Sequence, residues 1–186
     1  MRPLPIPSRC VKMHESQPQS IVVLGLGNLM RTDDAAGMFA LARLARDKRL
    51  PAGIRLVEGG TLGMELLYHV ENASLLLVLD AVDAGEPPGT LMLFRNEEVE
   101  ALPRNRSIHL LGLADLLGAL RLTGRAPEEV LLLGIQPEST GWGTELSPAV
   151  KAVQDKLIEI ALERIIAWDS QIAGALTESA DGLVSR

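Results

Sequence analysis

Short aliphatic runs alternate with helical patterns along this chain, and that alternation restricts it to an α/β fold. Each run has the length of a strand and is bounded by residues that favour turns, such as Gly, Pro, Asn and Asp. Aromatic residues make up only 3% of the sequence, so we expect an aliphatic core. The predicted strands are residues 21–25, 54–57, 75–79, 90–95 and 130–135.

The 186 residues correspond to one α/β domain of ordinary size. The longest helical pattern is at 148–168, where Ser147 is a suitable N-cap and Pro148 the first helical residue. Shorter helical patterns lie at 38–45, 64–71 and 111–122. We expect a flexible tail at 1–19, one domain at 20–169 and a second flexible tail at 170–186, where the pattern gives way to Gly, Ser, Thr and Asp.

The composition argues against several classes of protein. Lys and Arg number 18 against 24 Asp and Glu, a net charge of −6, so nucleic-acid binding is not expected. No apolar run has the length of a signal peptide or a membrane helix, which predicts a cytoplasmic protein without a membrane partner. The single cysteine, Cys10, excludes an internal disulfide and a Cys-rich zinc site. It lies in the predicted tail without a positioned base, so we expect no cysteine nucleophile, and no G-x-S-x-G motif indicates a serine hydrolase.

Polar residues follow the predicted strands at the edge where open α/β sheets bind their ligands. Those that follow the first, second, third and last predicted strands are Gly27, Asn28, Asp33, Asp34, Glu58, Asp80, Asp83, Gln136, Glu138 and Ser139. His109 precedes a helix, in a loop long enough to reach the same edge. These side chains are the candidates for a functional site.

Most of these candidates also have a structural interpretation. Gly25-x-Gly27 lacks the third glycine of a dinucleotide-binding fingerprint, because Met30 stands there, and is expected to form a tight turn. Asp33 and Asp34 can each cap the helix that follows. Asp83 and Glu58 are expected to form loop hydrogen bonds, and His69 is expected to be a structural residue on a short helix.

Asp80 interrupts an otherwise aliphatic run, where a carboxylate loses hydration energy unless it is paired or bound to a metal. Together with Asp34 and His109 it provides two carboxylates and one imidazole near strand ends. Three ligands of mixed oxygen and nitrogen type, with one open position, are typical of a catalytic or sensing metal site. The three residues lie far apart in the sequence, so their spacing alone does not establish a shared site.

Six motifs follow one another in the globular part of the chain. They are GLGNLMRTDDAAG (25–37), EGGTLGMELL (58–67), VLDAVDAG (78–85), PGT (88–90), SIHLLGLADLLGALRLTG (107–124) and GIQPES (134–139). This ordered set resembles the maturation endopeptidases of nickel–iron hydrogenases, over roughly residues 21–168. A single GxGN motif is weak evidence, whereas the ordered set is specific.

The resemblance implies a three-layer α/β/α sandwich around a twisted, five-stranded and mostly parallel sheet. It also implies that Asp34, Asp80 and His109 are both the nickel ligands and the catalytic residues. Gly59, Gly60 and Gly63 would shape the adjacent cleft wall. The family often has Glu where Asp34 stands and Gly where Ala35 stands.

The implied function is a nickel-dependent endopeptidase that removes the C-terminal extension of a nickel–iron hydrogenase large-subunit precursor after nickel insertion. In this family the nickel is thought to arrive with the substrate, so no stable small-molecule cofactor is expected. Two alternatives remain open from the sequence. One is a nucleotide- or cofactor-binding module built on Gly25-x-Gly27, and the other is a non-catalytic protein that checks metal insertion in a partner.

Overall fold

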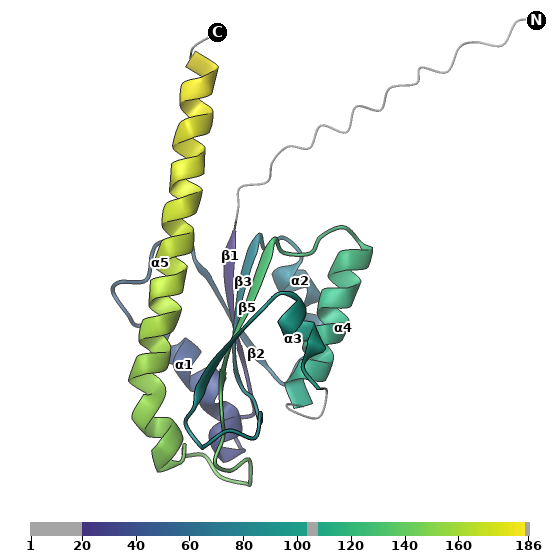
Figure 1. The fold of residues 1–186 in the computed structure, drawn as a ribbon, viewed down its shortest axis with the longest axis vertical. Helices are drawn as coiled ribbons and strands as arrows, with labels where there is room; N and C mark the ends of the chain where they lie inside the picture. The colour runs from purple at the N-terminus through teal and green to yellow at the C-terminus, as the bar shows by residue number, and fades with distance from the viewer. Residues whose placement is uncertain (1–19, 104–107, 185–186) are drawn as a thin grey trace, which may run out of the picture.

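The computed structural model describes residues 20–103 and 108–184, which contain a five-stranded sheet (Figure 1). The strands are β1 (Ile21–Leu26), β2 (Arg55–Gly60), β3 (Leu75–Ala81), β4 (Leu91–Arg95) and β5 (Glu129–Ile135). Their order is β2-β1-β3-β5-β4; all neighbours are parallel except β4, which runs antiparallel to β5. The five predicted strands and the mostly parallel sheet are confirmed.

Helices cover both faces of this sheet. One face carries α1 (Ala36–Leu44) and α5 (Pro148–Val184), and the other carries α2 (Leu67–Val70), α3 (Glu97–Ala101) and α4 (Ile108–Leu122) (Figure 1). Two short 3-10 helices, η1 (Thr32–Ala35) and η2 (Met64–Leu66), precede α1 and α2. The arrangement is the expected three-layer α/β/α sandwich, and among the α-helices of the described residues only α3 is not predicted by the sequence pattern.

The core is aliphatic and divided between the two faces of the sheet. Successive side chains of a strand point to opposite faces, so Leu76 and Val78 pack toward α4 while Leu75, Leu77 and Leu79 pack toward α1 and α5. Strands β1 and β3 are buried throughout. Burial on both faces explains why their sequences are continuous aliphatic runs rather than alternating ones.

Gly37 allows α1 to lie directly on the sheet. A Cβ atom at this position would come within 2.1 Å of the Leu79 carbonyl oxygen and 2.6 Å of the Leu26 carbonyl oxygen. Any larger residue would push α1 away from β1 and β3. Because η1 immediately precedes α1, the same close packing fixes the position of η1 above the edge of the sheet.

Helix α5 is longer than its sequence pattern predicts. Ser147 caps it as expected, since its Oγ accepts a hydrogen bond from the Val150 N–H at 3.4 Å. The predicted end near Ser170 is wrong, because the helix continues to Val184. Extending an existing helix needs no new nucleus, so a single Gly174 among Ala, Leu and Glu residues does not end it. The predicted tail at 1–19 lies outside the described residues.

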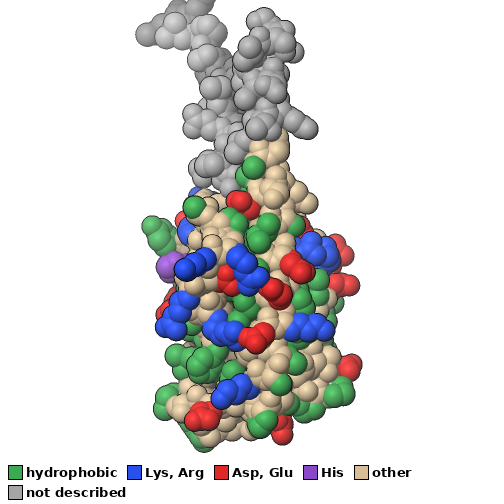
Figure 2. All heavy atoms as spheres, turned by 90° about the vertical axis from the view of Figure 1, so that its left-hand side faces the viewer, with side chains coloured by type: hydrophobic (Ala, Val, Ile, Leu, Met, Phe, Trp, Pro, Cys, Tyr) green, Lys and Arg blue, Asp and Glu red, His purple; other side chains and the backbone are tan. Residues whose placement is uncertain are grey.

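The outer face on which α5 lies carries basic and acidic side chains side by side (Figure 2). Arg43 pairs with Asp155, and Arg49 Nη1 lies 2.8 Å from Glu159 Oε2. These pairs are exposed to solvent, so each contributes little to stability. None of the helices in the described part of the chain is both long and apolar enough to cross a membrane.

Strand β1 marks the place where the strand order reverses. From β1 the chain moves to β2 on one side, and from β2 it crosses to β3 on the other side of β1. Helix α1 covers one face in the first connection, and α2 covers the opposite face in the second. In open α/β sheets the crevice at the carboxyl end of such a reversal is the usual ligand site. Both Asp34 and Asp80 belong to the segments that end there.

Candidate active site at the carboxyl edge of the sheet

Asp80 lies at the carboxyl end of β3 and faces the α4 side of the sheet, in line with Leu76 and Val78. Its Oδ1 accepts a hydrogen bond from the Ala81 N–H at 2.9 Å, and its carboxylate is fully buried. A buried carboxylate requires compensation from hydrogen bonds or a nearby positive charge. The structure provides that compensation from α4.

Helix α4 brings His109 to the same place. Its first turn packs closely on the loop before η2, since a Cβ atom on Gly112 would lie 2.9 Å from the Gly63 Cα. This close contact fixes His109 at the sheet edge. There the His109 Nδ1 lies 3.2 Å from Asp80 Oδ1, and only 2% of the histidine side chain is exposed.

Asp34 approaches the same imidazole from the other face of the sheet. It belongs to η1, and its Oδ2 accepts a hydrogen bond from the Asn28 N–H at 3.0 Å. The same Oδ2 lies 3.7 Å from His109 Nε2, and 10% of the Asp34 side chain is exposed. The three predicted residues are therefore brought together, with the imidazole between the two carboxylates. We call Asp34, Asp80 and His109 the carboxylate–imidazole cluster.

The cluster changes the acidity of His109. Burial lowers the pKa of the imidazole, but the hydrogen bond to Asp80 and the negative charges of Asp80 and Asp34 outweigh burial, so the pKa is raised above its usual value. The positive charge of Arg31 lowers the pKa of His109, but not enough to reverse the increase. The two carboxylates thus favour the protonated imidazole.

The donor set suits a divalent metal ion of borderline softness. Among residues 20–103 and 108–184, no three His, Cys, Asp or Glu side chains surround a common ion position. Each nitrogen of His109 faces a different carboxylate, so only one nitrogen can contact a given ion. A nitrogen and an oxygen bound to one ion at about 2.0–2.2 Å lie within about 4.2 Å of each other, and His109 Nε2 and Asp34 Oδ2 satisfy this at 3.7 Å. In this arrangement the Asp80 carboxylate would fix the orientation of the ring by accepting a hydrogen bond from Nδ1. Carboxylates commonly orient metal-binding histidines in this way.

Asp33 has a different role from the one predicted. Neither η1 nor α1 has a side-chain cap, so the expected helix cap is wrong for Asp33. Its carboxylate instead accepts hydrogen bonds from the N–H groups of Glu138 at 2.9 Å, Ser139 at 3.1 Å and Ser147 at 2.6 Å. Asp33 is completely buried and fastens the loop between β5 and α5 to η1.

The other strand-end candidates are structural or peripheral. Asp83 accepts a hydrogen bond from Gln136 Nε2 at 2.9 Å, which confirms its loop role. Gln136 Oε1 accepts from the N–H groups of Ala84 and Glu86, so it braces the loop after β3. Glu58 lies within β2 rather than after it, and its side chain is exposed. His69 is exposed on α2.

The turn after β1 does not resemble a phosphate site. Gly25 is packed against α1, where an added Cβ would lie 2.9 Å from the Leu41 Cβ. The backbone then enters η1, whose first turn carries Asp33 and Asp34. Two carboxylates stand where the phosphates of a dinucleotide would need positive charge. The tight-turn interpretation of Gly25-x-Gly27 agrees with this geometry.

Sequence reasoning did not single out Arg31. Its Nε donates a hydrogen bond to the Thr140 carbonyl oxygen at 2.8 Å, and its guanidinium lies 5.8 Å from the centre of the Trp142 ring. Arg31 therefore ties the loop after β1 to the loop after β5 at the rim of the cluster. In the sequence, its position two residues before the pair Asp33 and Asp34 is the signal that points to it.

Comparison with known proteins agrees with the geometry. The family model for hydrogenase maturation protease matches residues 40–164. The hydrogenase 2 maturation protease of Escherichia coli strain K12 is 44% identical over 149 residues, covering 79% of this chain and 88% of that protein. The hydrogenase expression/formation protein HupD of Rhodobacter capsulatus is 37% identical over 168 residues, covering 89% of this chain and 80% of that protein.

Solved structures show the same fold. The hydrogenase maturating endopeptidase HybD from E. coli superimposes with a TM-score of 0.73 at 39% identity, covering 87% of this chain and 94% of that one. The nickel–iron hydrogenase maturation protease HybD from Thermococcus kodakarensis gives a TM-score of 0.67 at 30% identity, covering 79% and 99%.

Proposed function

Since the chain belongs to the family of hydrogenase maturation proteases and is an endopeptidase, we propose that it removes the C-terminal extension of a nickel–iron hydrogenase large-subunit precursor after nickel insertion. The observation that carries this proposal is the carboxylate–imidazole cluster at the strand-order reversal. The cluster places two potential bases and one imidazole at the edge where this fold class binds ligands.

We further propose that the cluster recognises nickel carried by the precursor. The Asp34 carboxylate and the His109 imidazole are ligands that suit a borderline divalent ion, without the thiolates that would hold it permanently. His109 Nε2 and Asp34 Oδ2 are separated by a distance that one ion can span. The nickel is then part of the substrate, and its presence reports that the precursor is ready for cleavage.

The cluster residues have distinct roles in this proposal. Asp34 is the more exposed carboxylate and is the base that takes a proton from the attacking water. The water oxygen adds to the scissile carbonyl carbon, the C–N bond breaks, and the proton passes to the leaving amine. Asp80 is buried behind His109 and holds the imidazole in place. Substrate-bound nickel positions the scissile peptide against Asp34.

The surroundings of the cluster suit a protein substrate. Several large apolar side chains are exposed on the loops after β1, β2 and β5, which meet at this edge of the sheet. They are Leu29, Met30, Leu62, Met64 and Trp142. Exposed apolar groups concentrated around a polar site are typical of protein-binding surfaces.

The experiment that tests the function is incubation of the protein with nickel-loaded and nickel-free large-subunit precursor, followed by intact-mass measurement. We expect loss of the C-terminal extension only from the nickel-loaded precursor. Equal cleavage of both forms would contradict nickel recognition but would still support the proposed protease activity. Binding of the loaded precursor without any cleaved product would favour the non-catalytic checkpoint.

A further inference from the structure

Thr32, at the start of η1, has a backbone conformation that its residue type rarely adopts. Its φ is +30°, in the left-handed region that residues branched at Cβ avoid. Among residues 20–103 and 108–184, Asn96 is the only other residue besides glycine with a positive φ, and asparagine tolerates that region better. A strained residue persists only where its surroundings hold it, and such residues cluster at functional sites.

The loop between β5 and α5 holds Thr32 in this conformation. The Thr32 Oγ1 donates a hydrogen bond to the Ser139 carbonyl oxygen at 2.6 Å, and its N–H donates to the Gly143 carbonyl oxygen at 2.9 Å. The methyl group is enclosed as well, since a Cβ atom on Gly143 would lie 2.8 Å from Thr32 Cγ2. One loop therefore engages the hydroxyl, the amide and the methyl group of the same residue.

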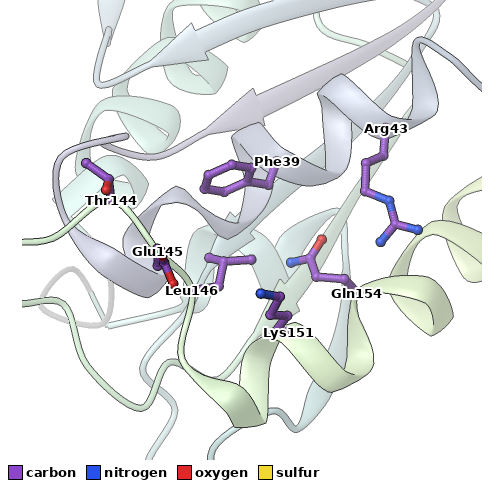
Figure 3. Close-up of a pocket in the computed structure, with 7 residues that line it drawn as sticks. All are labelled: Phe39, Arg43, Thr144, Glu145, Leu146, Lys151 and Gln154. Atoms are coloured by element: carbon purple, nitrogen blue, oxygen red, sulfur yellow. The ribbon is translucent and has the colours of Figure 1, made fainter.

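This loop is itself fixed against the body of the protein. Leu146 packs on the buried apolar cluster that includes Ala36 and Val150. Figure 3 shows the loop lying beside α1, where Leu146 and Phe39 line the same cavity. A loop anchored in this way can keep Thr32 strained, because the turn cannot relax without displacing packed side chains.

Thr32 lies inside the turn that carries Asp34. The Asp34 N–H donates a hydrogen bond to the Arg31 carbonyl oxygen at 2.8 Å, so Thr32 is a middle residue of a tight turn. The backbone of Asp34 also lies against Gly27, where an added Cβ would be 2.0 Å from the Asp34 carbonyl oxygen. The φ of Thr32 sets the direction of this turn. The 3.7 Å between Asp34 Oδ2 and His109 Nε2 therefore depends on it.

We propose that Thr32 is a positioning residue for cleavage: the loop between β5 and α5 holds its strained backbone through its hydroxyl, and this fixes the Asp34 carboxylate opposite His109. The inference rests on the proposed function, because it gives Thr32 a part in the reaction assigned to Asp34. Thr32 acts through Asp34 and not on the scissile bond. Its loss therefore lowers kcat per folded molecule and leaves KM nearly unchanged.

The first test compares Thr32→Val with Thr32→Ser. Valine keeps the branched shape but lacks the hydroxyl, so we expect kcat for the nickel-loaded precursor to fall about 10- to 100-fold, with KM within about threefold of the wild type. Serine keeps the hydroxyl and should restore kcat to within about threefold of the wild type. The control is Thr144→Val, at an exposed threonine of the same loop whose φ is not positive (Figure 3).

Two results of this comparison would overturn the inference. Wild-type kcat per folded molecule in Thr32→Val would make Thr32 a structural residue of the turn only. An equal loss of kcat in Thr32→Val and Thr32→Ser would show that the hydroxyl is not the anchor.

The second test uses Thr32→Gly, which separates activity from stability. Glycine adopts a positive φ without strain, so the relief of strain offsets the lost hydrogen bond and the melting temperature should stay within about 4 °C of the wild type. We expect kcat to fall about 5- to 50-fold, because the backbone before Asp34 is no longer held. A purely structural role predicts the opposite result, a lower melting temperature with unchanged kcat.

A third measurement needs no substrate and so separates this inference from the proposed function. The imidazole signals of His109 are recorded by NMR at one pH in the wild type, Thr32→Ser and Thr32→Val, and His109→Ala identifies them. We expect them to shift in Thr32→Val only, while the signals of the exposed His69 stay in place. If they shift in this way but the wild type does not cleave the precursor, the positioning of Asp34 by Thr32 stands and the proposed function fails. Unchanged His109 signals in Thr32→Val would overturn the inference, whatever the protein cleaves.

Discussion

Asp33 and Asp34 are neighbours in the sequence and differ completely in what they do. Asp33 accepts three backbone N–H hydrogen bonds from the loop between β5 and α5. Asp34 accepts one, from Asn28, and its carboxylate faces the imidazole of His109. Asp33 thus stabilises the loops of the sheet edge, and Asp34 remains available to the substrate.

The contrast shows how one turn can supply both a carboxylate that anchors a loop and a carboxylate that is available for chemistry. In the 3-10 turn, adjacent side chains diverge, so one carboxylate reaches the β5–α5 loop and the other reaches α4. A carboxylate with several N–H donors is committed to the fold, since its removal leaves those donors buried and unpaired. Substitutions at the two positions should therefore affect different measurements.

The largest effect is expected from His109→Ala, because His109 is the residue that the Asp34 carboxylate faces. This substitution removes the imidazole between Asp34 and Asp80, and we expect the cleavage rate to fall by about 10³-fold or more. Intact-mass time courses measure the rate, and circular dichroism checks the fold. His69→Ala, which changes an exposed histidine on α2, is the control and should cleave normally. A folded His109→Ala protein with wild-type cleavage would exclude the cluster as the active site.

The next largest effect is expected at Asp33. Asp33→Asn weakens three hydrogen bonds to a charged acceptor, so the free energy of unfolding should fall by about 2–4 kcal/mol. Denaturant titration measures this change. The cleavage rate per folded molecule should stay within about threefold of the wild type, since Asp33 does not face His109. An unchanged unfolding free energy would show that the loop does not depend on Asp33.

A smaller effect is expected when either carboxylate is lengthened by one methylene. Asp34→Glu keeps the charge at the more open position, so cleavage should remain within about tenfold of the wild type. Asp33→Glu has to fit between three fixed N–H groups and should lower stability by about 1–3 kcal/mol. Both are measured by the same rate and denaturant assays. A greater loss of stability from Asp34→Glu than from Asp33→Glu would reverse the assignment of the two residues.

The smallest effect is a dependence of stability on pH that belongs to His109. Because the pKa of His109 is raised in the folded protein, its stabilising contribution is complete below the unfolded value of about 6.5. That contribution is lost as the pH rises through the folded pKa, with a slope of at most about 1.4 kcal/mol per pH unit. Unfolding curves in chelator-treated buffer should show this decline for the wild type and for His69→Ala. His109→Asn should lack it, and a decline that persists in His109→Asn would assign it to another group.

Much of the fold could be predicted because local sequence determines it. The aliphatic runs between turn residues fix the strands, and the scarcity of histidine leaves His109 as the imidazole that can reach the carboxylates at the sheet edge. Helix α3 is only five residues long, too short for a periodic pattern. The sequence pattern underestimates the length of α5, because isolated weak helix breakers do not end a helix that is already nucleated.

The arrangement inside the site could not be predicted, because it depends on contacts between distant segments. The partners of Asp33 lie more than 100 residues away, so local sequence predicts a helix cap in place of its actual role. The place of the imidazole between the two carboxylates depends on the packing of Gly112 on Gly63. The unpaired amide of Gln154 reads in the sequence as one more polar residue on α5.

The separation of roles between Asp33 and Asp34 can be measured in one assay. Nickel-loaded large-subunit precursor is incubated with Asp33→Asn or Asp34→Asn, at a temperature at which both variants are folded, and its intact mass is followed over time. We predict that Asp33→Asn yields the shortened subunit at nearly the wild-type rate and that Asp34→Asn yields none. Normal processing by folded Asp34→Asn would contradict the assignment of Asp34 to the chemistry of cleavage.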